Sequence, residues 1–332
     1  MTRPGNVIPS ISIVVAAYNM SRELPRTIFS LSPCMQRGKI DPSSYEVIVV
    51  DNGSELPVDP GPWDKWGIQA RVIRIDTHEA RRSPVGALNR GIQDARGYLV
   101  GVMIDGARIA SPGILAGVAQ AAQLAPRFIA VTLGFHLGPK VQSESVLEGY
   151  DTDAEDTLLA ESGWTDDGYR LFSISTFSVS SRNGWFRPIS ESNALFMPRE
   201  LWSELGGFDE GFQSPGGGFA NLDLLSRAVN LPKVTVVTLL GEGTFHQVHG
   251  GVATNRSNDD LMAAFNAEYR GLRGRPYRAP EYESVYVGSV PEMPGTQPTN
   301  RTPDPVGFRA EPARHHRLRN AISRRVRSVW RR

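Results

Sequence analysis

Polar side chains follow three apolar runs of the sequence, and each run is typical of a buried strand. The runs span residues 11–17, 46–50 and 98–104, and the residues that follow them are Tyr18-Asn19, Asp51 and Asp105. Because the ligands of an open α/β sheet bind beyond the carboxyl ends of its strands, we expect these side chains to face a ligand crevice. A carboxylate there recovers its desolvation cost only from a partner such as a nucleobase N–H, a ribose hydroxyl or a metal ion. The alternative is an Asp that only ends a strand in a turn.

The motifs around these runs resemble family 2 glycosyltransferases. The matching segments are 12–19, 47–54, 86–92, 95–100, 206–210, 216–218 and Asp223-Leu224, so the resemblance covers roughly residues 10–250. It implies the GT-A fold, an α/β architecture with a Rossmann-like, mostly parallel central sheet flanked by helices and a smaller acceptor-side lobe. It also implies that a sugar is transferred from a nucleotide-sugar donor.

The resemblance implies a donor site at the ends of the first strands. The residues expected to bind the donor are Ala17, Tyr18, Asn19, Asp51, Asn89, Arg90 and Asp105. Asp51 would accept a hydrogen bond from the base. Arg90 would reach the diphosphate, since Arg pairs with phosphate oxygens; a surface arginine without a ligand is the alternative.

A divalent cation, Mn²⁺ or Mg²⁺, is the cofactor that the resemblance implies. Asp105 stands where the family has the first Asp of its DxD motif, but Gly106 and Ala107 replace the carboxylate expected after it. His246 or His249 follows the last strand and would complete the site, with the diphosphate supplying further oxygens. Loop packing is the alternative for a His-x-x-His pair.

The general base is harder to assign from the sequence. Relatives supply it from an acidic pair, but Ala220 and Asn221 stand at those positions here. Asn221 cannot act as a base, so Asp223 is the nearest carboxylate, and Asp209, Glu210 and Glu191 are further candidates. A helix cap or a salt bridge is the alternative role for each of these carboxylates. Trp185 and Asn193 are the candidates for acceptor binding, because an aromatic ring stacks on a sugar face and an amide bonds to hydroxyls.

The elements that would position these residues alternate between strand and helix patterns. Strand-like runs recur at 11–17, 46–50, 70–75, 98–104, 128–133, 193–197 and 234–240; helical patterns start near 21, 85, 112, 198, 221 and 259. This alternation predicts βαβ units and a mostly parallel sheet. The acidic and Ser/Gly-rich stretch 138–187 is expected to be a partly looped insertion. A dinucleotide-dependent oxidoreductase is not supported, because no G-x-G-x-x-G follows the first strand.

Four regions are expected along the chain. Residues 1–135 form the nucleotide-sugar-binding half and 136–270 the acceptor-binding and catalytic half. Residues 271–312 form an extended linker, and 313–332 a basic amphipathic helix. This last segment would contact an anionic membrane surface; a disordered tail, or one bound to the body of the protein, is the alternative.

Composition narrows the class of protein. The chain has 332 residues and 40% hydrophobic content, which suits a globular α/β protein. Residues 309–332 hold nine arginines and one acid, leaving 27 basic and 34 acidic residues elsewhere. Cys34 is the single cysteine, which fits a reducing compartment. We expect a cytoplasmic protein, peripheral at the inner membrane face if the tail binds lipid, and no nucleic-acid partner, since no groove-reading element accompanies the arginines.

These observations predict an inverting glycosyltransferase. Its acceptor would be a hydroxyl of a glycan or a lipid-linked sugar, in the synthesis of a cell-surface polysaccharide. The altered motifs at Asp105 and Asn221 leave a second hypothesis, a nucleotide-sugar-binding module of the same fold without activity.

Overall fold

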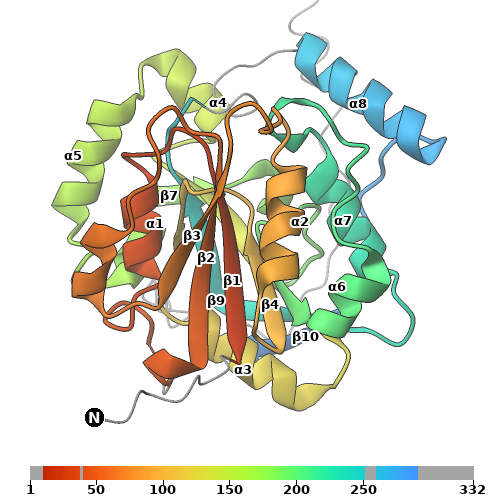
Figure 1. Cartoon of the computed structure of the whole chain (residues 1–332), viewed down its shortest axis with the longest axis horizontal. Coiled ribbons are helices and arrows are strands. Elements are labelled where there is room, and N and C mark those ends of the chain that lie inside the picture. The colour runs from red at the N-terminus through yellow and green to blue at the C-terminus, as the bar shows by residue number, and fades with distance from the viewer. Residues whose placement is uncertain (1–9, 38–39, 251–258, 291–332) are drawn as a thin grey trace, which may run out of the picture. The chain divides into compact units, whose positions relative to one another are not determined.

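The computed structural model describes residues 10–37, 40–250 and 259–290. The predicted helix at 313–332 and most of the predicted linker lie outside these residues. One ten-stranded sheet forms the centre of the described part (Figure 1). Its strands are β1 (Ile11–Ala17), β2 (Tyr45–Asn52), β3 (Ala70–Ile75), β4 (Leu99–Met103), β5 (Arg108–Ala110), β6 (Phe128–Leu137), β7 (Ser175–Phe177), β8 (Ala194–Pro198), β9 (Thr235–His246) and β10 (Val285–Gly288).

Eight α-helices connect or cover these strands in the described ranges. They are α1 (Leu24–Ser30), α2 (Val85–Asp94), α3 (Ile114–Leu124), α4 (Gln142–Ser145), α5 (Thr152–Ser162), α6 (Arg199–Leu205), α7 (Ala220–Val229) and α8 (Asp259–Arg273). Short 3₁₀ helices lie at Pro42–Ser44, Gly61–Trp66, Val146–Glu148, Gly168–Ile174, Val179–Ser181 and Pro215–Gly217. No helix of the described residues has the length and apolar character needed to cross a bilayer.

The strand order is β10-β9-β6-β8-β4-β1-β2-β3, with β5 paired to β9 and β7 to β6. β8 is antiparallel to both its neighbours, β4 and β6, whereas the pairs along β3-β2-β1-β4 and β10-β9-β6 are parallel. The carboxyl ends of β1, β2, β4, β6 and β9 therefore point to the same edge. The predicted mixed α/β fold with a mostly parallel sheet flanked by helices is confirmed.

Helices cover both faces of the sheet, so the central strands are buried on both sides. In β1, Val14 and Ala16 pack in the cluster that contains α2 and α6 residues, while Ile13, Val15 and Ala17 pack in the cluster that contains α1 and α3 residues. Figure 1 shows α1 and α5 on one side of the strands and α2, α6 and α7 on the other. Burial on two faces explains why these strands read as continuous apolar runs rather than alternating ones.

Several elements were not expected from the sequence. The stretch 138–187 was expected to be partly looped, yet it contains α5, whose N-cap Asp151 accepts hydrogen bonds from the backbone N–H groups of Asp153 and Ala154. The predicted linker from 271 includes the end of α8 and the strand β10, whose Val285-Tyr286-Val287 sequence pairs with β9. The boundary expected at residue 135 falls inside β6, so the sheet runs through it without interruption.

The pairing of β4 with β8 depends on a glycine. Gly101 lies opposite Phe196, and a Cβ added at Gly101 would lie 2.0 Å from the Phe196 ring. We expect Gly101→Ala to lower the free energy of unfolding by about 2 kcal/mol, because the ring cannot move in a packed core. Phe196→Leu should restore part of that loss.

Gly86→Ala is the matched control, since a Cβ at Gly86 on α2 meets nothing within 4 Å. It should leave stability unchanged or raise it by up to about 1 kcal/mol. Denaturant unfolding measures all three variants. An equal effect of the two Gly→Ala substitutions would contradict the close approach of Phe196.

Candidate functional site

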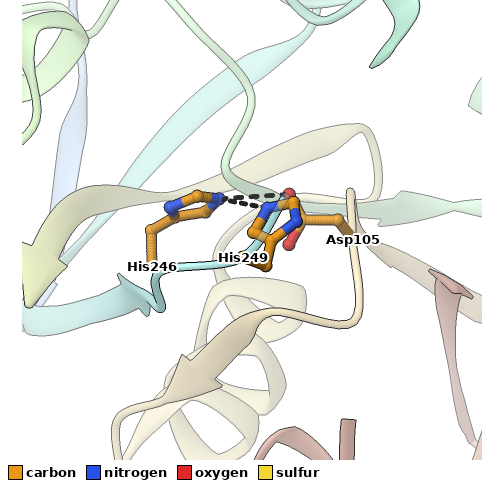
Figure 2. A group of neighbouring side chains, drawn as sticks. All are labelled: Asp105, His246 and His249. Atoms are coloured by element: carbon orange, nitrogen blue, oxygen red, sulfur yellow. Dashed lines mark hydrogen bonds and ion pairs between the residues drawn. The ribbon is translucent and has the colours of Figure 1, made fainter. Parts of the chain in front are cut away.

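A carboxylate and two imidazoles lie together at the carboxyl edge of the sheet. Asp105 follows β4, and His246 is the last residue of β9. They meet because β5 returns antiparallel along β9 with Arg108 opposite His246, and because the Gln247 N–H donates to the Ala107 carbonyl at 2.8 Å. Figure 2 shows the side chains of Asp105, His246 and His249 directed toward one another. The predicted trio thus comes from two segments about 140 residues apart in the chain.

The distances in this trio suit a shared ligand. His246 Nε2 lies 3.2 Å from His249 Nε2 and 3.7 Å from the nearer Asp105 oxygen, and all three ligand atoms lie within 4.8 Å of one another. Two ligands at right angles on a cation, each about 2.1 Å away, are separated by roughly 3 Å. One carboxylate oxygen and two imidazole nitrogens are also ligands that first-row divalent cations accept. The residues therefore fit a divalent cation.

The surroundings of His246 prepare its ring for ligation. Its Nδ1 lies 2.6 Å from Gln142 Oε1, an acceptor, so Nδ1 carries the proton and the Nε2 lone pair faces Asp105 and His249. Burial, and then the charge of Arg108, hold the pKa of His246 well below its ordinary value. The ring is therefore neutral at physiological pH, which is the form that binds metals. Nothing in the sequence around Gln142 indicated this contact.

The segment between the two histidines is held by hydrogen bonds to a buried carboxyl, Glu155, and to its neighbour Arg22. The Val248 N–H donates to Glu155 Oε2 at 2.8 Å, and its carbonyl accepts from Arg22 Nη1 at 3.0 Å. Arg22 also pairs with Glu155 at 3.2 Å, and the Glu155 side chain is fully buried. Helix α5 therefore supports the turn that carries His249, a role that its acidic sequence alone did not suggest.

Asp51 lies deep at the end of β2 and is already well bonded. Its oxygens accept from the backbone N–H groups of Ser54 and Val58 and from Arg74 Nη1. Burial acts to raise the pKa of Asp51, but these bonds hold it below its ordinary value, so the carboxyl is charged. Arg74 was missed from the sequence; its position opposite Asp51 in the β2–β3 register is the signal that could have found it.

The first-strand residues border Asp51 as expected. Ala17 lies opposite Asp51 in the β1–β2 register. Asn19 has a left-handed backbone (φ 51°), accepts from the Glu55 N–H at 2.9 Å and donates from its own N–H to Ser54 Oγ. Tyr18 is 54% exposed, so its ring remains open to a ligand.

Asn89 and Arg90 lie on α2, and within the described residues they make no hydrogen bond or ion pair with the strand-end residues above. The Asn89 amide is buried and bonds to both the N–H and the carbonyl of Phe208, so it joins α2 to the turn after α6. Arg90 is exposed, with its nearest carboxylate Asp94 at 3.8 Å. Their expected role toward the donor stays a prediction.

The carboxylates considered for the general base differ sharply in their surroundings. Asp223 is 1% exposed, and its oxygens accept from Arg227 Nε at 2.7 Å and from Arg273 Nε and Nη2 at 2.6 and 2.7 Å. Glu191 is partly exposed, and within the described residues its carboxylate makes no hydrogen bond or ion pair. The neighbouring Ser192 Oγ donates to the Asn221 carbonyl, so Glu191 lies beside the start of α7.

The two acceptor candidates are held by different bonds. Asn193 is buried, and its Oδ1 accepts from Arg108 Nη1 at 3.1 Å, which links it to the Asp105 loop. Trp185 is half-buried, and its Nε1 donates to the Glu242 carbonyl of β9 at 3.2 Å. Its ring packs against Phe135, Phe172 and Phe177.

The chain is thus an α/β protein with a mostly parallel sheet, and its candidate site lies at the carboxyl edge, where proteins of this class bind their ligands. The chain from residue 12 to 115 matches the model of a family described as glycosyl transferase family 2. The resemblance found in the sequence is thereby confirmed over the segment that contains β1 to β5.

Solved structures of S. aureus TarS are similar to this chain. The structure of TarS 1–349 has 12% identity and a TM-score of 0.49, covering 79% of this chain and 72% of that one. TarS 1–349 in complex with UDP has 13% identity, 79% and 72% coverage and a TM-score of 0.46. The complex with UDP-GlcNAc has 14% identity, 78% and 66% coverage and a TM-score of 0.47. No curated protein is a match to the sequence.

The buried Glu155 carboxyl gives stability a defined dependence on pH. Burial raises its pKa from an ordinary 4.5 to about 7, against the opposing effect of the Val248 N–H and Arg22. Between pH 4.5 and 7 the folded protein holds a proton that the unfolded chain releases, so unfolding becomes easier as pH rises. Relative to Glu155→Gln, wild-type stability should fall by on the order of 3 kcal/mol across this window.

Denaturant unfolding of both proteins at several pH values measures this difference. Glu148→Gln serves as the control, because that carboxylate is 58% exposed and pairs with Lys140 at the surface. A stability difference between wild type and Glu155→Gln that is flat from pH 4.5 to 7 would refute the shifted carboxyl.

Proposed function

We propose that this protein is an inverting glycosyltransferase that moves a sugar from a nucleotide-sugar donor to an acceptor hydroxyl. The observation that carries the proposal is the convergence of Asp105, His246 and His249 at the carboxyl edge of a sheet whose first strands match glycosyl transferase family 2. A nucleoside diphosphate is a leaving group that such a cation site suits.

The donor base and ribose bind in this proposal at the ends of β1 and β2. Asp51 with Arg74 offers both hydrogen-bond acceptors and donors, which match the C=O and N–H groups of a base edge. The exposed Tyr18 ring and Asn19 border the same place. Asn89 and Arg90 are assigned to the sugar and diphosphate because they lie in a motif that resembles the family's, not because of a contact in the structure.

Mn²⁺ or Mg²⁺ is held in this proposal by Asp105, His246 and His249. When bound, the cation neutralises the charge that develops on the departing diphosphate. The chain's own part is to hold the ligands: Gln142 fixes the tautomer of His246, and the Glu155–Arg22 pair holds the turn that carries His249.

Glu191 is the general base of the proposal. Asp223 is saturated by two arginines and buried, so it cannot reach an acceptor hydroxyl without breaking three hydrogen bonds. The Glu191 carboxylate accepts the hydroxyl proton while the acceptor oxygen bonds to the anomeric carbon and the bond from that carbon to the diphosphate oxygen breaks. Asn221 beside it and Asn193 and Trp185 nearby position the acceptor.

The acceptor of the proposed reaction is a glycan or a lipid-linked sugar, and the product contributes to a cell-surface polysaccharide. Contact of residues 313–332 with an anionic membrane stays a prediction, since these residues lie outside the described part. An inactive sugar-nucleotide-binding module is the second candidate, favoured by the missing second carboxylate after Asp105.

Donor turnover tests the proposed function directly. UDP-, GDP- and dTDP-sugars, UDP-GlcNAc among them, are assayed for release of the nucleoside diphosphate with Mn²⁺, with Mg²⁺ and with EDTA, with and without glycan acceptors. We expect metal-dependent turnover of one donor class, and a loss of about 100-fold or more in kcat/KM for Asp105→Ala.

Binding of a nucleotide sugar without turnover under any of these conditions would favour the inactive module. Absence of binding to the whole panel would overturn the proposed function.

The assignment of the base is tested with two isosteric variants. Glu191→Gln should lower kcat by about 10²–10⁴-fold and remove the acidic limb of the pH profile, with unchanged stability, because its carboxylate is free of partners in the described structure. Asp223→Asn should instead lower the free energy of unfolding by about 3 kcal/mol, because it leaves two arginines without their charged partner.

Glu204→Gln, at an exposed carboxylate paired with Arg127, is the control and should keep full activity. If Asp223→Asn has normal stability but no turnover, Asp223 is the general base and the assignment of Glu191 is wrong.

A further inference from the structure

A buried guanidinium lies directly beside the candidate cation site. Arg108 begins β5 opposite His246, and its side chain is only 8% exposed. Its Nε lies 3.3 Å from the Asp105 oxygen that is nearest to His246, and its Nη1 donates to Asn193 Oδ1 at 3.1 Å. The side chain thus fills the space between the Asp105 loop and the segment that carries Glu191.

The hydrogen bonding of this guanidinium is incomplete. An arginine has five N–H donors, yet Nη1 to Asn193 is the one hydrogen bond that Arg108 makes among the described residues, and its Nε is buried without a bond. A buried charge is costly unless it is paired and hydrogen-bonded. The charge of Arg108 is paired with Asp105, but most of its N–H donors have no acceptor among the described residues, so they remain able to bind an anion.

The charges around the candidate cation site lead to the same conclusion. Asp105 is the one acidic side chain of the trio, and the Arg108 Nε lies 3.3 Å from its carboxylate. The negative charge of Asp105 is thus opposed by one guanidinium. A divalent cation alone therefore meets little net negative charge. When it binds together with a diphosphate, the cation balances the Asp105 carboxylate and the diphosphate balances the Arg108 guanidinium.

We propose that Arg108 binds the diphosphate of the nucleotide donor, and that it makes cation binding depend on the nucleotide. The inference rests on the proposed function and adds to it the residue that recognises the leaving group. Guanidinium N–H groups bind phosphate oxygens in pairs. Because the Arg108 Nε lies 3.3 Å from the Asp105 oxygen that would hold the cation, a diphosphate bound to that cation would lie beside the guanidinium. In the absence of nucleotide the same charge repels the cation.

This role predicts effects of opposite sign in one variant. Removing the charge in Arg108→Gln should tighten binding of Mn²⁺ alone by about tenfold, because Asp105 loses its competing partner. The same variant should weaken binding of the nucleoside diphosphate in the presence of Mn²⁺ by about tenfold or more. Arg108→Lys keeps the charge without the paired N–H groups and should leave Mn²⁺ binding near wild type while weakening the nucleotide severalfold.

Titration calorimetry with Mn²⁺ alone, and with UDP, GDP and dTDP in saturating Mn²⁺, measures both effects on the full chain. Arg127→Gln is the matched control, because Arg127 precedes β6 at the opposite end of that strand from His136 and pairs with Glu204. It should leave all affinities unchanged. Thermal unfolding of each variant checks that the fold is retained.

The possible outcomes distinguish a wrong role for Arg108 from a wrong proposed function. Weaker binding of both Mn²⁺ and nucleotide in Arg108→Gln would mean that Arg108 only maintains the loop, and unchanged affinities would mean that it has no part in binding; either result overturns the inference alone. A wild-type protein that binds none of the three nucleotides would overturn the proposed function as well.

Discussion

The short pairing of β5 with β9 is the constraint on which the candidate site depends. Only three residue pairs form it, yet it places Arg108 opposite His246 and so returns the chain to the sheet immediately after Asp105. β9 is also paired in parallel with β6, which fixes its carboxyl end beside the ends of the neighbouring strands. A carboxylate after one strand and an imidazole at the end of another can share a ligand only because this pairing holds.

The buried ionisable side chains of the protein fall into two groups by how fully they are hydrogen-bonded. Asp51, Glu155, Asp223 and Glu242 each accept at least two hydrogen bonds, and three of them pair with arginine. Such groups stabilise one arrangement of the chain, because the loss of a partner would leave a charge without solvent. Arg108 and Glu191 differ from these in the described structure. The Arg108 Nε lies 3.3 Å from Asp105 but makes no hydrogen bond, and the Glu191 carboxylate makes no hydrogen bond or ion pair. For choosing candidate functional residues, a charged side chain with unused hydrogen-bonding groups is therefore more informative than one whose groups are all bonded.

Much of the architecture could be predicted from the sequence, because strands buried on two faces are long apolar runs and the helices between them have clear periodicity. Three-residue strands such as β5 are too short to have a periodicity, and α5 is too acidic to show an apolar face. Asp105 and the two histidines could be found because motifs mark their places. The pairing of Arg273 with Asp223 could not, since the two residues are 50 positions apart and only folding makes them neighbours.

The central claim is that Asp105, His246 and His249 hold one divalent cation against the donor diphosphate. Electron spin echo spectroscopy of Mn²⁺ bound in the presence of UDP tests it most directly, because it detects nitrogen nuclei that coordinate the ion. The account predicts couplings from two imidazole nitrogens, reduced to one in His246→Gln and in His249→Gln. A bound Mn²⁺ without nitrogen coupling, or with couplings that neither substitution changes, would contradict it.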